Sequence, residues 1–547
     1  MADTEISWVA PGAGTWELDA THRGRRPISP FLQDTLMREA GDGFTVVAEA
    51  YGLPLAEVRP ALVNGCLYFR MIGVGEGDKP SKTPPAWVMK VLTRVHPELR
   101  RRNRTAIRAW EEKRWRAEVD NWFDRERATV VATNREFHRV DLGALDDAEL
   151  VDQVQGRLAH FGAQARRNLV THGGDLVPTG DFLAHCRRWG IDDAEATALL
   201  RGSSPASIET AMILAPVGKA IAEAGTTPES IEAVRELGDD ARQAVDAWLE
   251  LHGWRIITTD DIDRPTLAER PNVQLAALLA AVNAPADAAA PDADATRAKV
   301  PQAERDTFDA LLVEARYGMR QRDDSVGVRW NWSAGLLRGA LLECAKRLVA
   351  RGALERADDV FELTPEELGA LLTAGTGPTA AEIAARAEHR DRVEAAHAPD
   401  HLGPVEEPPP FDVFPPALAR ATAAIFAVME AEGITKESAG NDLCGTGIGD
   451  STYRGTARVA TSADDALDRL TPGDVLVTSF TGPSYNSILP ILGALVTDAG
   501  GTMCHAAIVA REFSLPAVVG ATEATTRIPD GATVEVDPVA GRVSVLD

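Results

Sequence analysis

The sequence offers no cysteine pair for metal or disulfide chemistry and no long apolar run. Its five cysteines lie far apart without a CxxC spacing, so neither a zinc knuckle nor a disulfide framework is indicated. No apolar segment approaches the roughly 20 residues that a membrane span requires. The first residues lack the basic stretch and apolar core that are typical of a signal peptide. These absences predict a cytoplasmic protein whose thiols stay reduced.

Positive charge is scarce as well. Lys and Arg number 57 against 82 Asp and Glu, which gives a formal net charge of −25. A surface this acidic disfavours nucleic acids and anionic membranes, and neither is expected as a partner. Residues 100–127 are a local exception because they are basic and carry three Trp. Acidic residues interrupt the same segment, so we interpret it as an amphipathic helix with Trp in the core.

The chain is long and has the pattern of a helical protein over most of its length. Its 547 residues allow three or four domains, and 45% hydrophobic residues predict packed cores. Apolar residues recur at helical spacing before residue 395. The clearest such stretches are residues 147–168, 207–225, 231–252, 306–322 and 333–352.

Two segments of unusual composition interrupt this pattern. Residues 283–298 are rich in Ala, Asp and Pro, which predicts a flexible segment near 283–300. Residues 396–416 are rich in Pro, which favours extended chain, so a linker with a connecting helix is expected over residues 396–437. From residue 438 to the end, short runs of Val, Leu and Thr alternate with turns. The expected fold class is therefore a mostly α N-terminal region followed by a C-terminal α/β domain.

The segment that is most informative about function is VTDAGGTMCHAAIVAREFSLPAVVG, residues 496–520. A strand is expected to end at Thr497, Gly500 and Gly501 allow a tight turn, and a helix is expected to begin near His505. The free N–H groups and the dipole at a helix N-terminus favour an anion and disfavour a cationic imidazole. His505 is therefore a candidate neutral nucleophile for a phosphoryl group.

This segment resembles the phosphohistidine swivelling domain shared by phosphoenolpyruvate synthase, pyruvate phosphate dikinase, enzyme I of the sugar phosphotransferase system and rifampicin phosphotransferase. The resemblance covers most of residues 440–547 and includes the upstream PGDVLVT. It implies a swivelling domain at 438–547 in which His505 carries a phosphoryl group between two active centres. Met503 stands where the synthase and the dikinase usually carry Thr, which favours the rifampicin phosphotransferase branch. The neighbours expected to position the phosphoryl group are Gly500, Gly501, Thr502, Cys504 and Arg511.

The rest of the chain resembles the same branch in its layout. Residues 16–31 and 355–368 are similar to the acceptor-substrate region of rifampicin phosphotransferase-like proteins, so residues 1–395 are expected to form an acceptor domain. There is no room for the ATP-grasp-like nucleotide domain of the longer relatives, and Gly218-Lys219 lacks the spacing of a P-loop. The layout is that of rifampicin phosphotransferase, or of phenylphosphate synthase, without its ATP-binding domain.

The resemblance implies one component of an ATP-dependent phosphotransferase. A separate ATP-grasp-like subunit would bind ATP and Mg²⁺ and load His505, so this chain is expected to hold no tightly bound cofactor and no metal. His505 would then phosphorylate a small-molecule hydroxyl, such as a phenol, and a variant in which this activates the hydroxyl for elimination stays open. The alternatives are a regulatory or relay phosphocarrier that phosphorylates another protein and a binding protein that keeps the fold without transfer. The long helical region favours an acceptor pocket over a simple relay.

Six residues are candidates for the acceptor site. Arg316 and Arg320 lie four apart on one helix face, near Arg322, which suits the binding of an anion. The alternative for these arginines is a solvated face paired with neighbouring acidic residues. His22 and Arg26 lie in a loop marked by Gly and Pro and are a candidate base and phosphate clamp.

The sixth candidate is His172. Two glycines follow it, which allows the close approach of a ligand, although a plain turn also explains the pattern.

Overall fold

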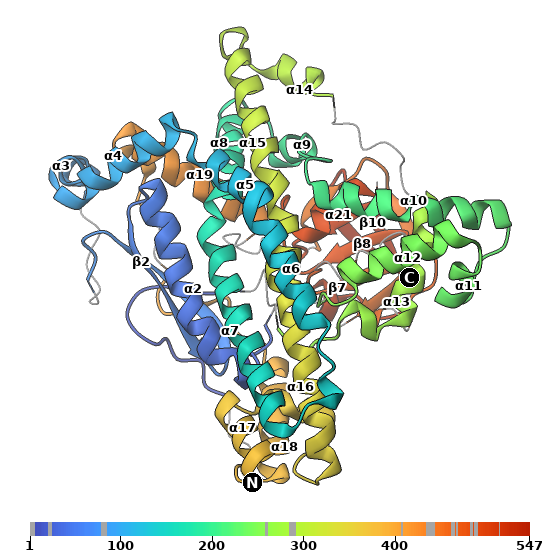
Figure 1. Ribbon diagram of the computed structural model, residues 1–547. Coiled ribbons are helices and arrows are strands. Elements are labelled where there is room, and N and C mark those ends of the chain that lie inside the picture. Colours follow the sequence, from blue (N-terminus) through green and yellow to red (C-terminus); the bar gives the residue numbers. More distant parts are fainter. Residues whose placement is uncertain are drawn as a thin grey trace. The chain divides into compact units, whose positions relative to one another are not determined.

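The computed structural model describes most of the chain. Its description leaves out residues 1–5, 20–24, 78–84, 257–260, 284–291, 406–408, 434–442, 461–464, 467–468, 482–484, 486–490, 514 and 547. Figure 1 shows the helices and strands with their labels. Packing divides the chain into two compact units whose segments alternate along the sequence. Unit 1 comprises residues 1–174, 260–264 and 325–422, and unit 2 comprises residues 175–259, 265–324 and 423–547. This grouping is not the linear division at residues 395 and 438, which stays a prediction.

Unit 1 is mostly helical and contains a small antiparallel sheet. Its sheet has four strands in the order β2-β3-β1-β4. The strands are β1 (Trp16–Leu18), β2 (Leu55–Val63), β3 (Cys66–Gly73) and β4 (His401–Leu402). Its helices are α2 (Pro30–Tyr51), α3 (Ala86–Val95), α4 (Pro97–Glu111), α5 (Arg114–Asn121), α6 (Arg127–His138), α7 (Asp147–Thr171), α16 (Trp332–Ala350), α17 (Pro365–Ala374) and α18 (Ala380–Ala395). The sequence analysis did not anticipate this sheet.

The helices of unit 1 begin and end where local chemistry requires. Asp146 caps α7 by accepting a hydrogen bond from the backbone N–H of Glu149 at 2.9 Å, and the Glu149 side chain bonds back to complete a capping box. The predicted single helix over residues 100–127 is wrong. It breaks after α4 at Lys113, whose φ is 47°, because a left-handed residue cannot continue a right-handed helix.

Unit 2 combines a set of helices with a seven-stranded sheet. The helices are α8 (Gly173–Arg188), α9 (Asp193–Ala198), α10 (Pro205–Ala224), α11 (Ile231–Arg235), α12 (Asp239–His252), α13 (Pro271–Ala280), α14 (Asp294–Lys299), α15 (Arg305–Ser325), α19 (Pro416–Glu432), α21 (His505–Glu512) and α22 (Ala524–Arg527), of which α8, α15 and α19 extend across a unit boundary. Part of the segment expected to be flexible is helical in α14, and residues 284–291 lie outside the description.

The sheet of unit 2 matches the α/β domain expected from the sequence. Its strand order is β11-β10-β6-β7-β8-β9-β5, and β6, β7, β8 and β9 run parallel. The strands are β5 (Thr446–Ile448), β6 (Tyr453–Ala460), β7 (Val475–Thr478), β8 (Ala494–Thr497), β9 (Ala517–Val519), β10 (Thr533–Asp537) and β11 (Arg542–Leu546). All residues of β7, β8 and β9 are buried, as parallel strands usually are. The predicted fold class, a helical N-terminal region and a C-terminal α/β domain, is confirmed.

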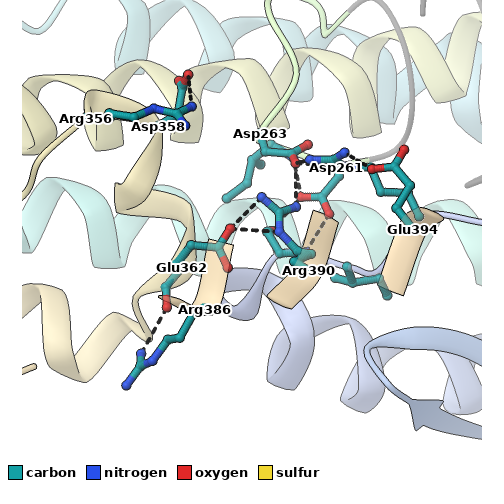
Figure 2. A network of polar contacts seen from close by, with 12 residues as sticks. Asp261, Asp263, Arg356, Asp358, Glu362, Arg386, Arg390 and Glu394 are labelled. Atoms are coloured by element: carbon teal, nitrogen blue, oxygen red, sulfur yellow. Dashed lines mark hydrogen bonds and ion pairs between the residues drawn. The ribbon is translucent and has the colours of Figure 1, made fainter. Parts of the chain in front are cut away.

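A network of buried charges fixes the short middle segment of unit 1. Asp263 is ion-paired with Arg26 at 2.8 Å. Asp263 is also ion-paired with Arg390 at 2.6 Å (Figure 2). Arg390 also pairs with Glu362 at 2.6 Å, and Glu362 is 1% exposed. The two arginines hold the pKa of Asp263 below its usual range, while burial raises the pKa of Glu362. Breaking such a pair leaves an uncompensated buried charge, so the contact with Arg390 ties Asp263 to α18.

Candidate functional site

His505 begins helix α21 in unit 2. Strand β8 ends at Thr497, the turn at Gly500 and Gly501 follows, and Cys504 is the N-cap of α21. The predicted start of the helix is therefore confirmed. Strands β7 and β8 are parallel and end in register at Thr478 and Thr497. The segments that follow the two strands consequently leave the same edge of the sheet, where ligands bind in many α/β folds.

The two ring nitrogens of His505 have different surroundings. Nδ1 lies 3.0 Å from Oγ1 of Thr481, a hydrogen-bond distance. Nε2 is buried and has no hydrogen-bond partner among the described residues. When the Nδ1–H donates to Thr481, the lone pair of the neutral ring lies on Nε2. The geometry thus leaves one nitrogen without a competing bond.

Burial keeps the imidazole neutral. The His505 side chain is only partly exposed, and desolvation by burial lowers its pKa from 6.5 to about 3. The sequence analysis expected a neutral ring because of the helix dipole. The structure agrees on the direction, but burial is the cause of the shift.

The glycine turn before His505 is packed too tightly for larger residues. A Cβ at Gly501 would lie 2.4 Å from the carbonyl oxygen of Ala431, and a Cβ at Gly500 would lie 2.6 Å from Sγ of Cys504. Gly433, just after α19, is equally close: its Cβ would lie 2.7 Å from the carbonyl carbon of Gly500. The end of α19 therefore rests directly against the turn.

Hydrogen bonds add to this packing. The backbone N–H of Met503 donates to the carbonyl of Ala431 at 2.8 Å, and Nη1 of Arg511 donates to the carbonyl of Thr502. Burial lowers the pKa of Arg511 to about 10 and raises the pKa of the Cys504 thiol. In this structure Arg511 and Thr502 hold the turn.

Met503 connects the turn to the helices of unit 2. Its side chain is 1% exposed and belongs to an apolar cluster with Phe182 of α8, Met319 of α15 and Val428 of α19. An apolar residue at this position therefore has a packing role. The sequence could not show this, because the partners are 70 or more residues away along the chain.

Comparisons with known proteins agree with this geometry. Residues 470–541 match the model of the PEP-utilising enzyme mobile domain. Residues 182–324 match the rifampicin phosphotransferase fourth domain. The chain carries a PEP-utilising enzyme mobile domain.

Several longer proteins resemble the chain. A rifampicin phosphotransferase of Streptomyces sviceus is 30% identical over 339 residues, which are 56% of this chain and 35% of that protein. A rifampicin phosphotransferase of Bacillus cereus is 30% identical over 38% of this chain and 21% of its own length. An uncharacterized phosphotransferase, YvkC of Bacillus subtilis, is 30% identical over 38% of this chain and 23% of its own length. The chain thus spans about a third or less of the relatives that it matches.

The three arginine candidates on α15 lie in the same unit as the mobile domain. Nε of Arg316 donates to the carbonyl of Leu199 at 2.9 Å, and burial lowers the pKa of Arg316. The guanidinium of Arg320 lies 5.1 Å from the ring centroid of Tyr317. Arg322 is different because it is ion-paired with Glu432 at the end of α19, which raises its pKa.

The other candidates lie in unit 1 or outside the description. Arg26 is held by the ion pairs with Asp263 and Glu394. His172 follows α7 as its C-cap, with Nε2 3.5 Å from the side-chain amide of Asn168. His22 lies outside the described residues. Arg26 and His172 thus belong to a different unit from His505.

A metal centre finds no support in the described part of the chain. No group of three or more His, Cys, Asp and Glu side chains is arranged there to hold an ion. In the same part, no helix combines the length and apolar character needed to cross a bilayer.

Sequence reasoning missed Thr481, the residue that contacts the imidazole. The sequence did contain a signal for this contact. Thr481 lies just after the expected strand GDVLVTSF, and the glycine turn lies just after the next strand, which ends at Thr497. Parallel neighbouring strands bring their carboxyl ends to one sheet edge. A hydroxyl in the first loop could therefore have been paired with the histidine of the second.

Proposed function

We propose that this chain is the phosphocarrier and acceptor component of an ATP-dependent phosphotransferase. The observation that supports the proposal most is the neutral His505 ring, with Nδ1 at Thr481 and Nε2 without a partner among the described residues. The mobile-domain match over residues 470–541 and the phosphotransferase names of the relatives favour the same reaction class.

In the loading step, the Nε2 lone pair of His505 attacks a phosphorus atom of ATP. The P–O bond to the leaving phosphate oxygen breaks as the N–P bond forms. The ring proton stays on Nδ1, where Thr481 accepts a hydrogen bond and shares the positive charge of the phosphoimidazolium. Nε2 is buried in the described structure, so loading requires a movement that uncovers it. Rotation of the mobile domain would supply that movement.

In the second step, the phosphoryl group passes to a small-molecule hydroxyl. The hydroxyl oxygen attacks phosphorus, the N–P bond breaks, and a base takes the hydroxyl proton. Arg316 and Arg320 are the cations best placed in the sequence to bind the phosphoryl oxygens, because they share one face of α15 within the rifampicin phosphotransferase-like segment. Asp323 is a candidate base, since burial raises its pKa.

ATP and Mg²⁺ would be held by a separate ATP-grasp-like subunit. The acidic residues of this chain show no arrangement for a cation within its described part, so the metal would enter with the nucleotide. If loading follows the dikinase pattern, the bond between the β-phosphorus and the AMP oxygen breaks as the N–P bond to His505 forms, AMP leaves, and water takes the γ-phosphoryl group as phosphate.

The test mixes the purified chain, an ATP-grasp-like protein encoded beside it, and ATP labelled at the β- or γ-position. We expect acid-labile label on the wild type and none on His505→Ala. His172→Ala is the matched control and should label like the wild type. Arg316→Ala with Arg320→Ala should load normally and lose transfer to added hydroxyl acceptors at least tenfold. Label that persists in His505→Ala would refute the proposal.

A further inference from the structure

Helix α3 of unit 1 carries an apolar stripe that faces solvent. Trp87 is 71% exposed, Val91 54% and Val95 59%. These residues are four apart and share one helix face, with Leu92 beside them at 43% exposure. The other side of α3 is anchored, because Oγ1 of Thr93 donates to the carbonyl of Val413 at 2.8 Å. Four large apolar side chains on ten residues form the α3 stripe, and this much exposed apolar surface usually marks a binding face.

The adjoining helix α4 carries a basic stripe. Arg100, Arg104 and Arg108 are exposed, share one face at a spacing of four, and have no ion pair within the part of the chain that is described. Their neighbour Arg101 shows the contrast, since it is ion-paired with Glu98 at 2.6 Å. Like charges at this spacing repel each other. Acidic groups of another molecule could pair with these three arginines, which are unpaired among the described residues although the chain has a net charge of −25.

We propose that the α3 and α4 stripes dock the ATP-binding subunit, through a surface with an apolar centre and a carboxylate rim. The proposal rests on the proposed function, which requires such a subunit. Trp and Arg together are the side chains most enriched at the energetic centres of protein interfaces.

Charge favours a protein over a polyanion as the occupant. A membrane or a nucleic acid presents negative charge over a large area, which the rest of this acidic chain would repel. The field of a compact acidic patch on a partner protein is screened beyond about 8 Å at physiological salt. Such a patch therefore interacts mainly with the three arginines and little with the acidic remainder of this chain.

The experiment uses the ATP-grasp-like protein that labels wild-type His505. One variant combines Trp87→Ser and Val91→Ser, and the other combines Arg100→Glu, Arg104→Glu and Arg108→Glu. The apolar control is Val539→Ser, whose side chain is 77% exposed in unit 2. The charge control reverses three other surface cations, Lys219, Arg242 and Lys346, whose side chains are 76%, 53% and 76% exposed.

We expect both stripe variants to bind the subunit at least tenfold more weakly in calorimetry, with the controls within twofold of the wild type. Labelling of His505 should slow in parallel and recover at saturating subunit, which separates docking from chemistry. Labelling and binding that stay unchanged in both stripe variants would overturn the docking surface alone. If no ATP-grasp-like protein labels the wild type, the proposed function falls and this proposal falls with it.

Two further measurements address the other occupants. Vesicles containing phosphatidylserine should not sediment the wild-type chain, and its sedimentation coefficient should not depend on its concentration. Stripe-dependent vesicle binding or self-association, with unchanged affinity for the subunit, would assign the surface to a membrane or to a second copy and overturn the proposal.

Discussion

Nδ1 of His505 and Oγ1 of Thr481 lie 3.0 Å apart, although the two residues follow different strands of the sheet. Thr481 is 7% exposed, so its hydroxyl is held in place by its surroundings. The contact sets the ring orientation, and when the Nδ1–H donates to Thr481 the lone pair on Nε2 is free. Thr481 is thus a positioning residue in the proposed reaction.

Removing this hydroxyl should slow the loading of His505. Thr481→Val keeps the shape but loses the hydrogen bond, which is worth about 1 kcal/mol, so we expect a rate loss of roughly fivefold to tenfold. Thr481→Ser should restore most of the rate. Nitrogen-15 NMR of the ring should show the proton shared between both nitrogens in the Val variant. An unchanged rate and tautomer would contradict the role of Thr481.

Loading should be insensitive to mild acid. The pKa of His505 is lowered to about 3 by burial, so the ring stays a neutral nucleophile from pH 8 to pH 5. An ordinary histidine would lose half of its nucleophilic form near pH 6.5. Single-turnover labelling over this range measures the effect, and a midpoint between pH 6 and 7 would show that the ring is solvated.

The same shift makes stability depend on pH. The folded pKa lies below the unfolded value of 6.5, so the unfolded chain binds the extra proton and stability falls as the pH drops below 6.5. Between pH 7.5 and 5.5 this contribution is about 1.4 kcal/mol. Urea unfolding of wild type and His505→Gln at both values should show a smaller loss in the variant. An equal loss would contradict the lowered pKa.

The contact between α19 and the glycine turn should not tolerate a methyl group. Gly433 has a φ of +87° and its Cβ would lie 2.7 Å from Gly500, so Gly433→Ala combines backbone strain with a backbone clash. Gly225 is the matched control, because it also ends a helix, has a φ of +64° and has no atom within 4 Å of its Cβ. We expect Gly433→Ala to cost about 1–3 kcal/mol more than Gly225→Ala in chemical denaturation. Equal losses would mean that the turn can move aside.

Two arginines on α18 should differ sharply in their effect on stability. Arg390 is 10% exposed in its side chain and pairs with Asp263 and Glu362, so Arg390→Met should cost about 3–5 kcal/mol. Arg386 lies one turn earlier, is 39% exposed and pairs with Glu367, so Arg386→Met should cost under about 1 kcal/mol. Thermal unfolding of the two variants compares them, and similar losses would show that the Asp263 network is solvated.

The sequence predicted the site better than its surroundings. The His505 turn uses only local signals, a strand end, two glycines and a helix start, and these were read correctly. The Met503 cluster depends on residues distant in sequence, so no local pattern reveals it. The Thr481 contact required one further step, the pairing of the ends of two neighbouring parallel strands. The role of Arg26 as a phosphate clamp stays a prediction. Its carboxylate partners Asp263 and Glu394 are more than 200 residues away, so no local pattern could show them.

The route of the chain through its two units has a practical consequence for dissection. Residues 260–264 belong to unit 1 while the segments on both sides belong to unit 2, so no single cleavage yields two intact halves. A fragment that starts at residue 423 would keep the sheet but remove the neighbours of Met503 on α8 and α15, exposing an apolar surface. Such a fragment should aggregate.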